Sequence, residues 1–282
     1  MDQNTVTRVI PARTRGDLAA LASPSALPLA GGSWIYSEPN SGIDTFVDLL
    51  PLGWPAIERT PEGLTIGATC TLAELSRLEH PLFFECCNAL YGSFKVWNVA
   101  TVGGNLATAL PAGPMTSLLA GLDAEVLVWE ADGSDTRMPV AEFITGNKTT
   151  ALTRGAVLRS ISVPHASLLA ATAFRKIALS ALGRSGAVLV GRLDTDGAFV
   201  LTVTAGTVRP VQLRYPALPA ASLLAADIAA IESWFTDAHG AADWRRAVSG
   251  VLGEEIRAEL AARPQAPGPQ APEPKTAGED AR

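Results

Sequence analysis

Short apolar runs alternate with helical spacing along the first part of the chain. Alternating or continuous apolar residues predict β-strands, at residues 5–10, 27–29, 44–50, 64–69, 124–130, 136–140 and 156–163. Apolar residues three and four positions apart predict helices, at residues 14–21, 72–78, 81–90 and 115–122. Thr71 and Glu74 have the spacing of a capping box, in which the two residues bond each other's backbone amides. Residues 96–105 include a glycine pair and fit neither pattern, so we expect an irregular segment there.

The pattern changes after about residue 167. Strands are predicted at residues 171–177, 186–193 and 199–204. Asp196-Gly197 between the last two is typical of a tight hairpin turn, as is Asp132-Gly133 earlier in the chain. The order of strands followed by helices is typical of an α+β unit with an antiparallel sheet.

Two helices are expected at the end of this second unit. Asp227 is a good N-cap residue, so the first helix is predicted to begin there and to present Ile228, Ile231 and Phe235 on its apolar face. The second helix is predicted at residues 242–260, which places the smaller α+β domain at residues 168–262. Residues 263–282 hold five prolines, with alanine as the only hydrophobic residue type. Such a stretch buries too little surface to order itself, so we expect a disordered tail.

Composition excludes several function classes. With 28 acidic and 22 basic residues the net charge is −6, which argues against a nucleic-acid or membrane-surface protein. We expect no membrane-spanning helix and no signal peptide, and the unpaired cysteines fit a cytoplasmic location. Three cysteines and three histidines cannot supply a four-cysteine iron–sulfur or zinc site from this chain alone. Any redox or metal chemistry would therefore use a centre that is not built from these side chains.

The cysteines and histidines themselves are expected to have structural roles. Cys86 and Cys87 are adjacent on a predicted helix and cannot both easily bind one metal ion, and Cys70 lies at a strand-to-helix corner. We interpret all three as buried thiols. The three histidines are far apart in the sequence, and we predict neither a catalytic residue nor a metal ligand.

Two glycine pairs are the candidate chemistry of the chain. One lies in Ala30-Gly31-Gly32-Ser33 after an apolar run, and the other in Ala100-Thr101-Val102-Gly103-Gly104-Asn105. Glycine lets a backbone approach and surround an anion, and convergent amides can neutralise a diphosphate. Taken singly, each pair is most often an ordinary turn. The chain contains neither the Gly-x-Gly-x-x-Gly fingerprint nor a Gly-Lys-Ser/Thr phosphate loop.

The two glycine segments and their flanks resemble a known family. The segments that carry the resemblance are residues 29–33, 64–75, 99–107 and 118–126. They are similar, in order and spacing, to the FAD-binding medium subunit of molybdenum hydroxylases of the carbon monoxide dehydrogenase and xanthine dehydrogenase type. The resemblance is close over residues 5–165 and looser over residues 168–262.

This resemblance implies the fold. Residues 1–165 are expected to form a two-lobed α+β FAD-binding domain of the PCMH and CO dehydrogenase flavoprotein type, with lobes at about 1–55 and 56–165. Residues 168–262 would be the family's smaller antiparallel α+β C-terminal domain. Neither glycine segment contains histidine, so FAD would be bound non-covalently.

The resemblance also implies the cofactor-binding residues. The two glycine segments would hold the FAD diphosphate, Tyr91 would place an aromatic ring near the isoalloxazine, Leu158 would contact the flavin, and Arg175 or Lys176 would offer a basic side chain. The implied set is Ala30, Gly31, Gly32, Ser33, Trp34, Tyr91, Ala100, Thr101, Val102, Gly103, Gly104, Asn105, Leu158 and Lys176.

The resemblance further implies an electron-transfer function. FAD would receive electrons from a [2Fe–2S] partner and pass them to an external acceptor. A large subunit would carry the molybdenum cofactor, a small subunit would carry the [2Fe–2S] clusters, and the assembly would be a heterotrimer or its dimer, (αβγ)2. Substrate oxidation would take place on the large subunit.

Four departures from the family pattern support a second hypothesis. Trp34 stands where the family usually has a small or polar residue, and Trp97 where it usually has a basic one. Pro114 replaces a common aspartate, and the segment 183–187 lacks another aspartate. The alternative is a degenerate structural subunit with weak or no FAD binding.

Overall fold

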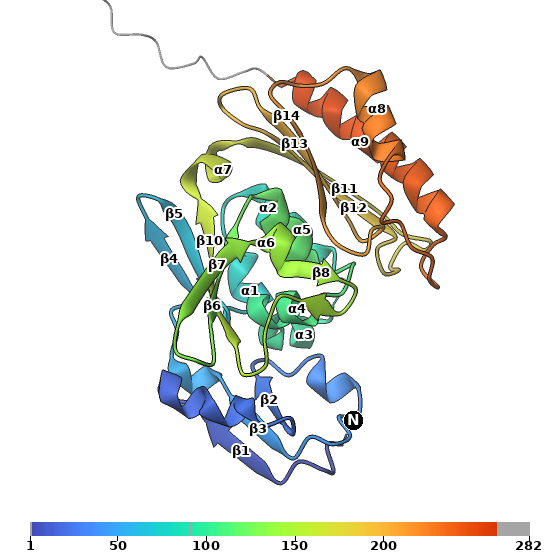
Figure 1. Cartoon of the computed structure of the whole chain (residues 1–282). Coiled ribbons are helices and arrows are strands. Elements are labelled where there is room, and N and C mark those ends of the chain that lie inside the picture. The colour runs from blue at the N-terminus through green and yellow to red at the C-terminus, as the bar shows by residue number, and fades with distance from the viewer. Residues whose placement is uncertain (1, 91, 264–282) are drawn as a thin grey trace, which may run out of the picture.

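The computed structural model describes residues 2–90 and 92–263, and three larger sheets organise them into an α+β fold (Figure 1). The first sheet is parallel, in the order β1-β3-β2, and is formed by β1 (Arg8–Pro11), β2 (Ala26–Leu29) and β3 (Thr45–Asp48). The short 3-10 helices of this lobe are η1 (Arg15–Ala22), η2 (Ile35–Ser37) and η3 (Leu50–Leu52). Leu18 and Leu21 of η1 pack with Val47 of β3 in a small core of their own.

The second sheet is antiparallel and carries the central helices. Its order is β4-β5-β10-β6-β7, from β4 (Ile57–Thr60), β5 (Gly63–Gly67), β10 (Val157–Pro164), β6 (Glu125–Trp129) and β7 (Asp135–Pro139). The helices are α1 (Leu72–Leu75), α2 (Pro81–Asn88), α3 (Phe94–Val99), α4 (Val102–Thr108), α5 (Pro114–Gly121) and α6 (Val140–Phe143), followed by the hairpin β8 (Ile144–Gly146) and β9 (Thr149–Thr150). Every residue of α5 is buried, so this helix is the centre of the core. The capping box of Thr71 and Glu74 is confirmed, with both reciprocal bonds present.

The third sheet is antiparallel, in the order β11-β12-β13-β14, and α7 (His165–Leu169) leads into it. Its strands are β11 (Ala171–Ile177), β12 (Ala187–Leu193), β13 (Phe199–Thr204) and β14 (Val211–Tyr215), and its helices are α8 (Ala221–Ala229) and α9 (Ala242–Ala261). The two helices cover one face, while α5 packs against β12 and β13. A Cβ atom on Gly191 would lie 2.1 Å from Ile256, so glycine lets α9 approach the sheet closely. The predicted hairpin turns at Asp132-Gly133 and Asp196-Gly197 are both confirmed.

A polar cluster joins the second and third sheets. Asp123 follows α5 and accepts hydrogen bonds from Arg192 on β12 and from Arg214 on β14. Burial alone would raise the pKa of the Asp123 carboxyl, but the two arginines lower it below its ordinary value. Ser117 and Thr204 add a buried hydroxyl contact of 2.6 Å across the same junction. The C-terminal sheet is therefore fixed to the core helix α5.

Three local predictions were wrong. The segment 96–105 is not irregular, because α3 and α4 occupy it, joined by two extended residues. Asp227 is not an N-cap: α8 begins after Ala220, and the Asp227 carboxylate accepts a 2.6 Å hydrogen bond from Tyr215 near the end of that helix. Ile231 and Phe235 consequently lie outside a helix. Strands β4, β8, β9 and β14 were not predicted at all.

Of the tail expected at residues 263–282, all but Arg263 lies outside the described residues. Among the described residues, no helix combines the length and apolar character that crossing a membrane requires. The sheets fall within the ranges predicted for the two lobes and the C-terminal domain. The domain boundaries themselves stay a prediction.

Candidate functional site

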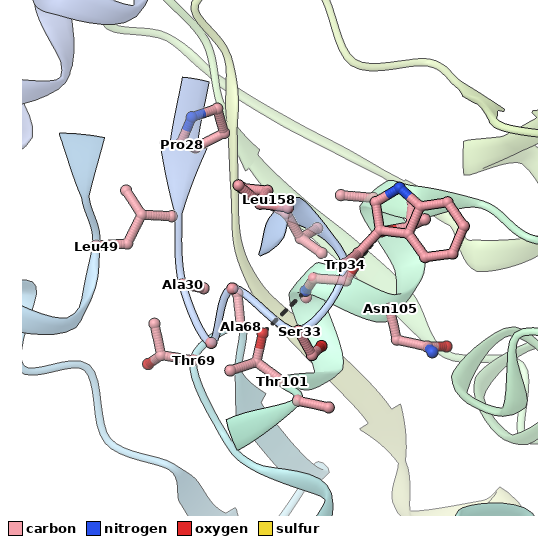
Figure 2. A pocket seen from close by; sticks show the side chains of 18 of the residues that line it. Pro28, Ala30, Ser33, Trp34, Leu49, Ala68, Thr69, Thr101, Asn105 and Leu158 are labelled. Atoms are coloured by element: carbon pink, nitrogen blue, oxygen red, sulfur yellow. Dashed lines mark hydrogen bonds between the residues drawn. The ribbon is translucent and has the colours of Figure 1, made fainter. Parts of the chain in front are cut away.

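A cleft of about 560 Å³ lies between the two glycine segments. We call residues 30–34 the first loop and residues 100–105 the second loop. The first loop follows β2, the second loop includes the start of α4, and Leu158 of β10 lines the same cleft (Figure 2). The volume is within the range of about 300–1,000 Å³ that is usual for small-molecule and cofactor sites. The fold thus brings together segments about 70 residues apart in the sequence.

The first loop presents unpaired backbone donors. Gly32 has φ +69°, a left-handed conformation that glycine adopts without steric cost. Within the part of the chain that the structure describes, the amides of residues 31–34 donate no hydrogen bond. The carbonyl of Gly32 accepts a 2.9 Å bond from the Tyr36 amide, which fixes the end of the loop. Four consecutive N–H groups therefore remain available to a ligand.

Gly31 is needed where the two loops touch. A Cβ atom at this position would lie 1.5 Å from the carbonyl oxygen of Val99, the last residue of α3. Such a contact is impossible without moving the backbone of one loop. Glycine at position 31 therefore serves the packing of the loops against each other.

The second loop is built differently, because its amides are used by the fold. Val102 and Gly103 donate to the carbonyls of Cys70 and Ala68 at 2.9 and 2.8 Å, and Gly104 donates to the Thr101 hydroxyl at 3.1 Å. Gly103 packs so closely on Ala68 that a Cβ atom would lie 2.5 Å from the Ala68 Cβ. These bonds hold the second loop rigidly against the corner between β5 and α1.

Asn105 faces the cleft with a fixed orientation. Its Oδ1 accepts a 3.1 Å hydrogen bond from the amide of Met115. Because that bond uses the oxygen, the Nδ2 group is the one left without a partner among the described residues. Pro114 precedes Met115 as the first residue of α5, a position that suits proline because it needs no N–H. The Asn105 side chain thus caps the start of α5 by accepting from the Met115 amide, which the N-cap residue Gly113 cannot do because it has no side chain.

The two ends of the cleft differ in character. Pro28 and Leu49 lie at one end, and Trp34 and Asn105 at the other (Figure 2). Lys148, in the turn between β8 and β9, also lines the cleft, and it is the only charged residue among the described lining residues. Sequence reasoning missed Lys148. Its one signal was the two-residue turn after Gly146, which gives no indication that the hairpin reaches the cleft.

Most of the predicted residues meet at the cleft. Those that line it are Ala30, Gly31, Gly32, Ser33, Trp34, Ala100, Thr101, Gly103, Gly104, Asn105 and Leu158. Val102 does not, because its side chain is buried in the central core. Lys176 does not line the cleft either, since it lies on β11 of the C-terminal sheet, and the neighbouring Arg175 forms ion pairs with Glu255 and Glu259 at 2.9 Å. Tyr91 lies outside the described residues.

The remaining candidate side chains have structural positions. Burial raises the pKa of the Cys70 and Cys87 thiols to about 12, and that of Cys86 well above its ordinary value, so all three are inert, buried thiols as predicted. His80 caps α2 by accepting from the Leu82 amide at 3.3 Å. Trp97 does not line the cleft, and its ring packs against Phe84.

Comparison with known proteins identifies the family. Residues 5–166 match the family described as FAD binding domain in molybdopterin dehydrogenase. The chain belongs to this family. Over 171 residues it is 27 % identical to the xanthine dehydrogenase/oxidase of Gallus gallus, which covers 54 % of the chain and 13 % of that protein. Over 163 residues it is 28 % identical to the nicotinate dehydrogenase FAD-subunit of Eubacterium barkeri, which covers 53 % of the chain and 54 % of the relative.

Solved structures confirm the predicted fold class. The reconstituted CO dehydrogenase from Oligotropha carboxidovorans has a chain that superposes with a TM-score of 0.82 at 22 % identity, covering 94 % of this chain and 100 % of that one. A chain of quinoline 2-oxidoreductase from Pseudomonas putida 86 superposes with a TM-score of 0.78 at 20 % identity, covering 93 % and 98 % of the two chains. The family predicted from the glycine segments is confirmed as well.

Proposed function

We propose that the chain is the FAD-binding, electron-transferring subunit of a molybdenum-containing oxidoreductase and that the cleft holds FAD non-covalently. The observation that carries the proposal is the first loop, whose four unpaired amides belong to residues that line a cofactor-sized cleft in a chain of this family. Unpaired N–H groups around a left-handed glycine form the kind of concavity that binds anions. The residues present therefore fit the diphosphate of FAD.

Each part of the cleft has a distinct role in this proposal. The amides of residues 31–34 and the Asn105 Nδ2 would donate to the diphosphate, and the rigid second loop would set the width of the cleft. The apolar end near Pro28 and Leu49 would exclude water from an adenine ring. When bound, FAD supplies an isoalloxazine that accepts single electrons and releases a pair.

The proposed complex has two partner subunits. A small subunit with [2Fe–2S] clusters would deliver electrons to FAD, and a large subunit with the molybdenum cofactor would oxidise the substrate, in a heterotrimer or its dimer, (αβγ)2. The relatives named above support this proposal by what they are: a nicotinate dehydrogenase FAD-subunit and a CO dehydrogenase. Among the lining residues that the structure describes, the one ionisable side chain is that of Lys148.

Flavin release tests the proposal against a purely structural subunit. The protein should be purified with its co-expressed partners and denatured, and the supernatant analysed for FAD by chromatography. We expect about one FAD per chain. A denatured complex whose supernatant contains no FAD would contradict the proposal and support a structural subunit, in which Trp97 and Pro114 mark lost cofactor contacts.

A further inference from the structure

Lys148, which lines the cleft, has an unusual backbone conformation. Its φ of +58° is in the left-handed region, which residues other than glycine, asparagine and aspartate rarely adopt. The turn is held in place because the Lys148 amide donates a 2.8 Å bond to the carbonyl of Ala109, just after α4. Strained residues of this kind often lie at functional sites.

The side chain reaches across to the segment that follows the first loop. Its Nζ lies 4.9 Å from the centroid of the Trp34 ring and 3.7 Å from Oε1 of Glu38. The aromatic face stabilises the ammonium by a cation–π interaction. Lys148 therefore spans from the β8–β9 hairpin to the side chain of Trp34, the last residue of the first loop.

Charge makes this position significant. The diphosphate of FAD carries two negative charges, and the first loop offers only the partial charges of its amides. Lys148 is the one full charge among the described residues that line the cleft. Its ion pair with Glu38 is exposed on both sides, 53 % for each side chain, and exposed pairs are weak. An arriving diphosphate could therefore displace Glu38 at little cost.

We infer that Lys148, oriented by the ring of Trp34, is the cationic partner of the cofactor's diphosphate and exchanges Glu38 for it when the cofactor binds. This inference rests on the proposed function. It also gives Trp34 a role, because a ring at this position positions the ammonium beside the loop amides. The departure from the family pattern at Trp34 is then part of a diphosphate site rather than a sign of its decay.

The test compares flavins with and without a diphosphate. Lys148→Met keeps an apolar side chain on Trp34 and removes the charge. Dissociation constants of FAD and riboflavin should be measured with the full chain by flavin fluorescence at several salt concentrations. We expect FAD to bind about tenfold more weakly, as for a lost charge-assisted hydrogen bond, with a smaller salt dependence. Riboflavin binding should be unchanged. Lys95→Met is the matched control, since Lys95 is exposed on α3 outside the cleft and should change neither.

A second variant tests the exchange itself and does not alter the strained turn. Glu38→Gln removes the competing carboxylate from an exposed position, so FAD should bind about twofold more tightly, a change expected for a weak surface pair. Equal losses of affinity for FAD and riboflavin in Lys148→Met would show that the residue only maintains the structure of the cleft. That result would overturn the inference. So would unchanged FAD binding in both variants. Failure of the wild-type chain to bind FAD would instead contradict the proposed function.

Discussion

The two loops that flank the cleft share a Gly-Gly pair and use it in opposite ways. In the first loop Gly32 adopts a left-handed conformation, and the amides of residues 31–34 remain unpaired. In the second loop the amides of residues 102–104 are all bonded within the protein. Gly103 is there because Ala68 leaves no room for a side chain.

This difference separates recognition from support. Donors that the fold has not used are free to bind an anion, while donors already bonded to the β5–α1 corner can only hold their loop in place. The backbone of the first loop should therefore control affinity for the cofactor, and the backbone of the second loop should control the stability of the lobe that carries it. Substitutions within each pair can test this division.

The largest expected effect is on stability and lies in the second loop. In Gly103→Val the new Cβ would lie 2.5 Å from the Cβ and 2.8 Å from the carbonyl oxygen of Ala68. Because the Ala68 side is a buried corner of backbone, we expect the free energy of unfolding to fall by about 3 kcal/mol, as for severe overpacking. Urea unfolding followed by circular dichroism measures this change.

The matched control for this substitution is Gly250→Ala. Gly250 lies in α9 with open space around it, and alanine is favoured over glycine within helices by about 1 kcal/mol. This variant should therefore be as stable as the wild type or more stable. If Gly103→Val unfolded at the wild-type urea concentration, the close packing of the second loop would not matter for stability.

The next effect is on affinity and lies in the first loop. Gly32→Ala places a Cβ on a residue at φ +69°, which costs about 1–2 kcal/mol in the left-handed region. The loop would relax by rotating its amides away from the cleft. We expect FAD to bind about tenfold more weakly, as for the loss of one hydrogen bond to a charged group. Isothermal titration with FAD measures the change.

Gly42→Ala is the control for the free-energy cost of placing a side chain on a left-handed residue. Gly42 has φ +88° and open space around it, and it does not line the cleft. Its substitution should reduce stability and leave FAD affinity unchanged. Equal affinity losses in the two variants would show that the first loop acts through general stability, which would remove the distinction between the loops.

Sequence reasoning found the two loops because their glycines and neighbours form contiguous motifs. It could not distinguish their uses, since the difference depends on partners such as Ala68 and Val99, which are contributed by other segments. The antiparallel C-terminal sheet was predictable for the same reason, because its hairpin turn Asp196-Gly197 is a local signal. Local motifs were therefore the dependable part of the prediction.

The failures share a long-range cause. Lys148 reaches the cleft only because its turn is bonded to Ala109, a contact between segments about 40 residues apart. Asp227 resembles an N-cap, yet its carboxylate is bound by Tyr215 on β14. Each of these depends on tertiary contacts that spacing along the chain does not reveal.

A smaller effect is expected from the cap of the second loop. Thr101→Val removes the hydroxyl that accepts from the Gly104 amide at 3.1 Å. Loss of an N-cap typically costs about 1 kcal/mol of stability, and the freed amide should leave FAD affinity nearly unchanged. Thr101→Ser keeps the hydroxyl and should restore the wild-type stability in urea unfolding. A larger loss of FAD affinity than in Gly32→Ala would contradict the supporting role of this loop.

The smallest expected effect is a pH dependence of stability, which the His80 cap of α2 should show and the Thr101 cap of α4 should not. His80 caps α2 through its unprotonated Nδ1, and burial lowers the pKa of His80 below its ordinary value of 6.5. The unfolded chain therefore binds this proton at a higher pH than the folded chain, so the stability from the cap is present above about pH 6.5 and is lost as the pH falls through the lowered pKa. The wild-type protein should therefore lose about 0.5–1 kcal/mol of unfolding free energy between pH 7 and pH 5. His80→Asn keeps a capping group that does not titrate, so this variant should not show that loss. Urea unfolding at these two pH values measures the difference. The loss of unfolding free energy in Thr101→Val should be the same at pH 7 and at pH 5, because a hydroxyl does not titrate in this range. If that loss depended on pH, the second loop would be coupled to an ionisable group.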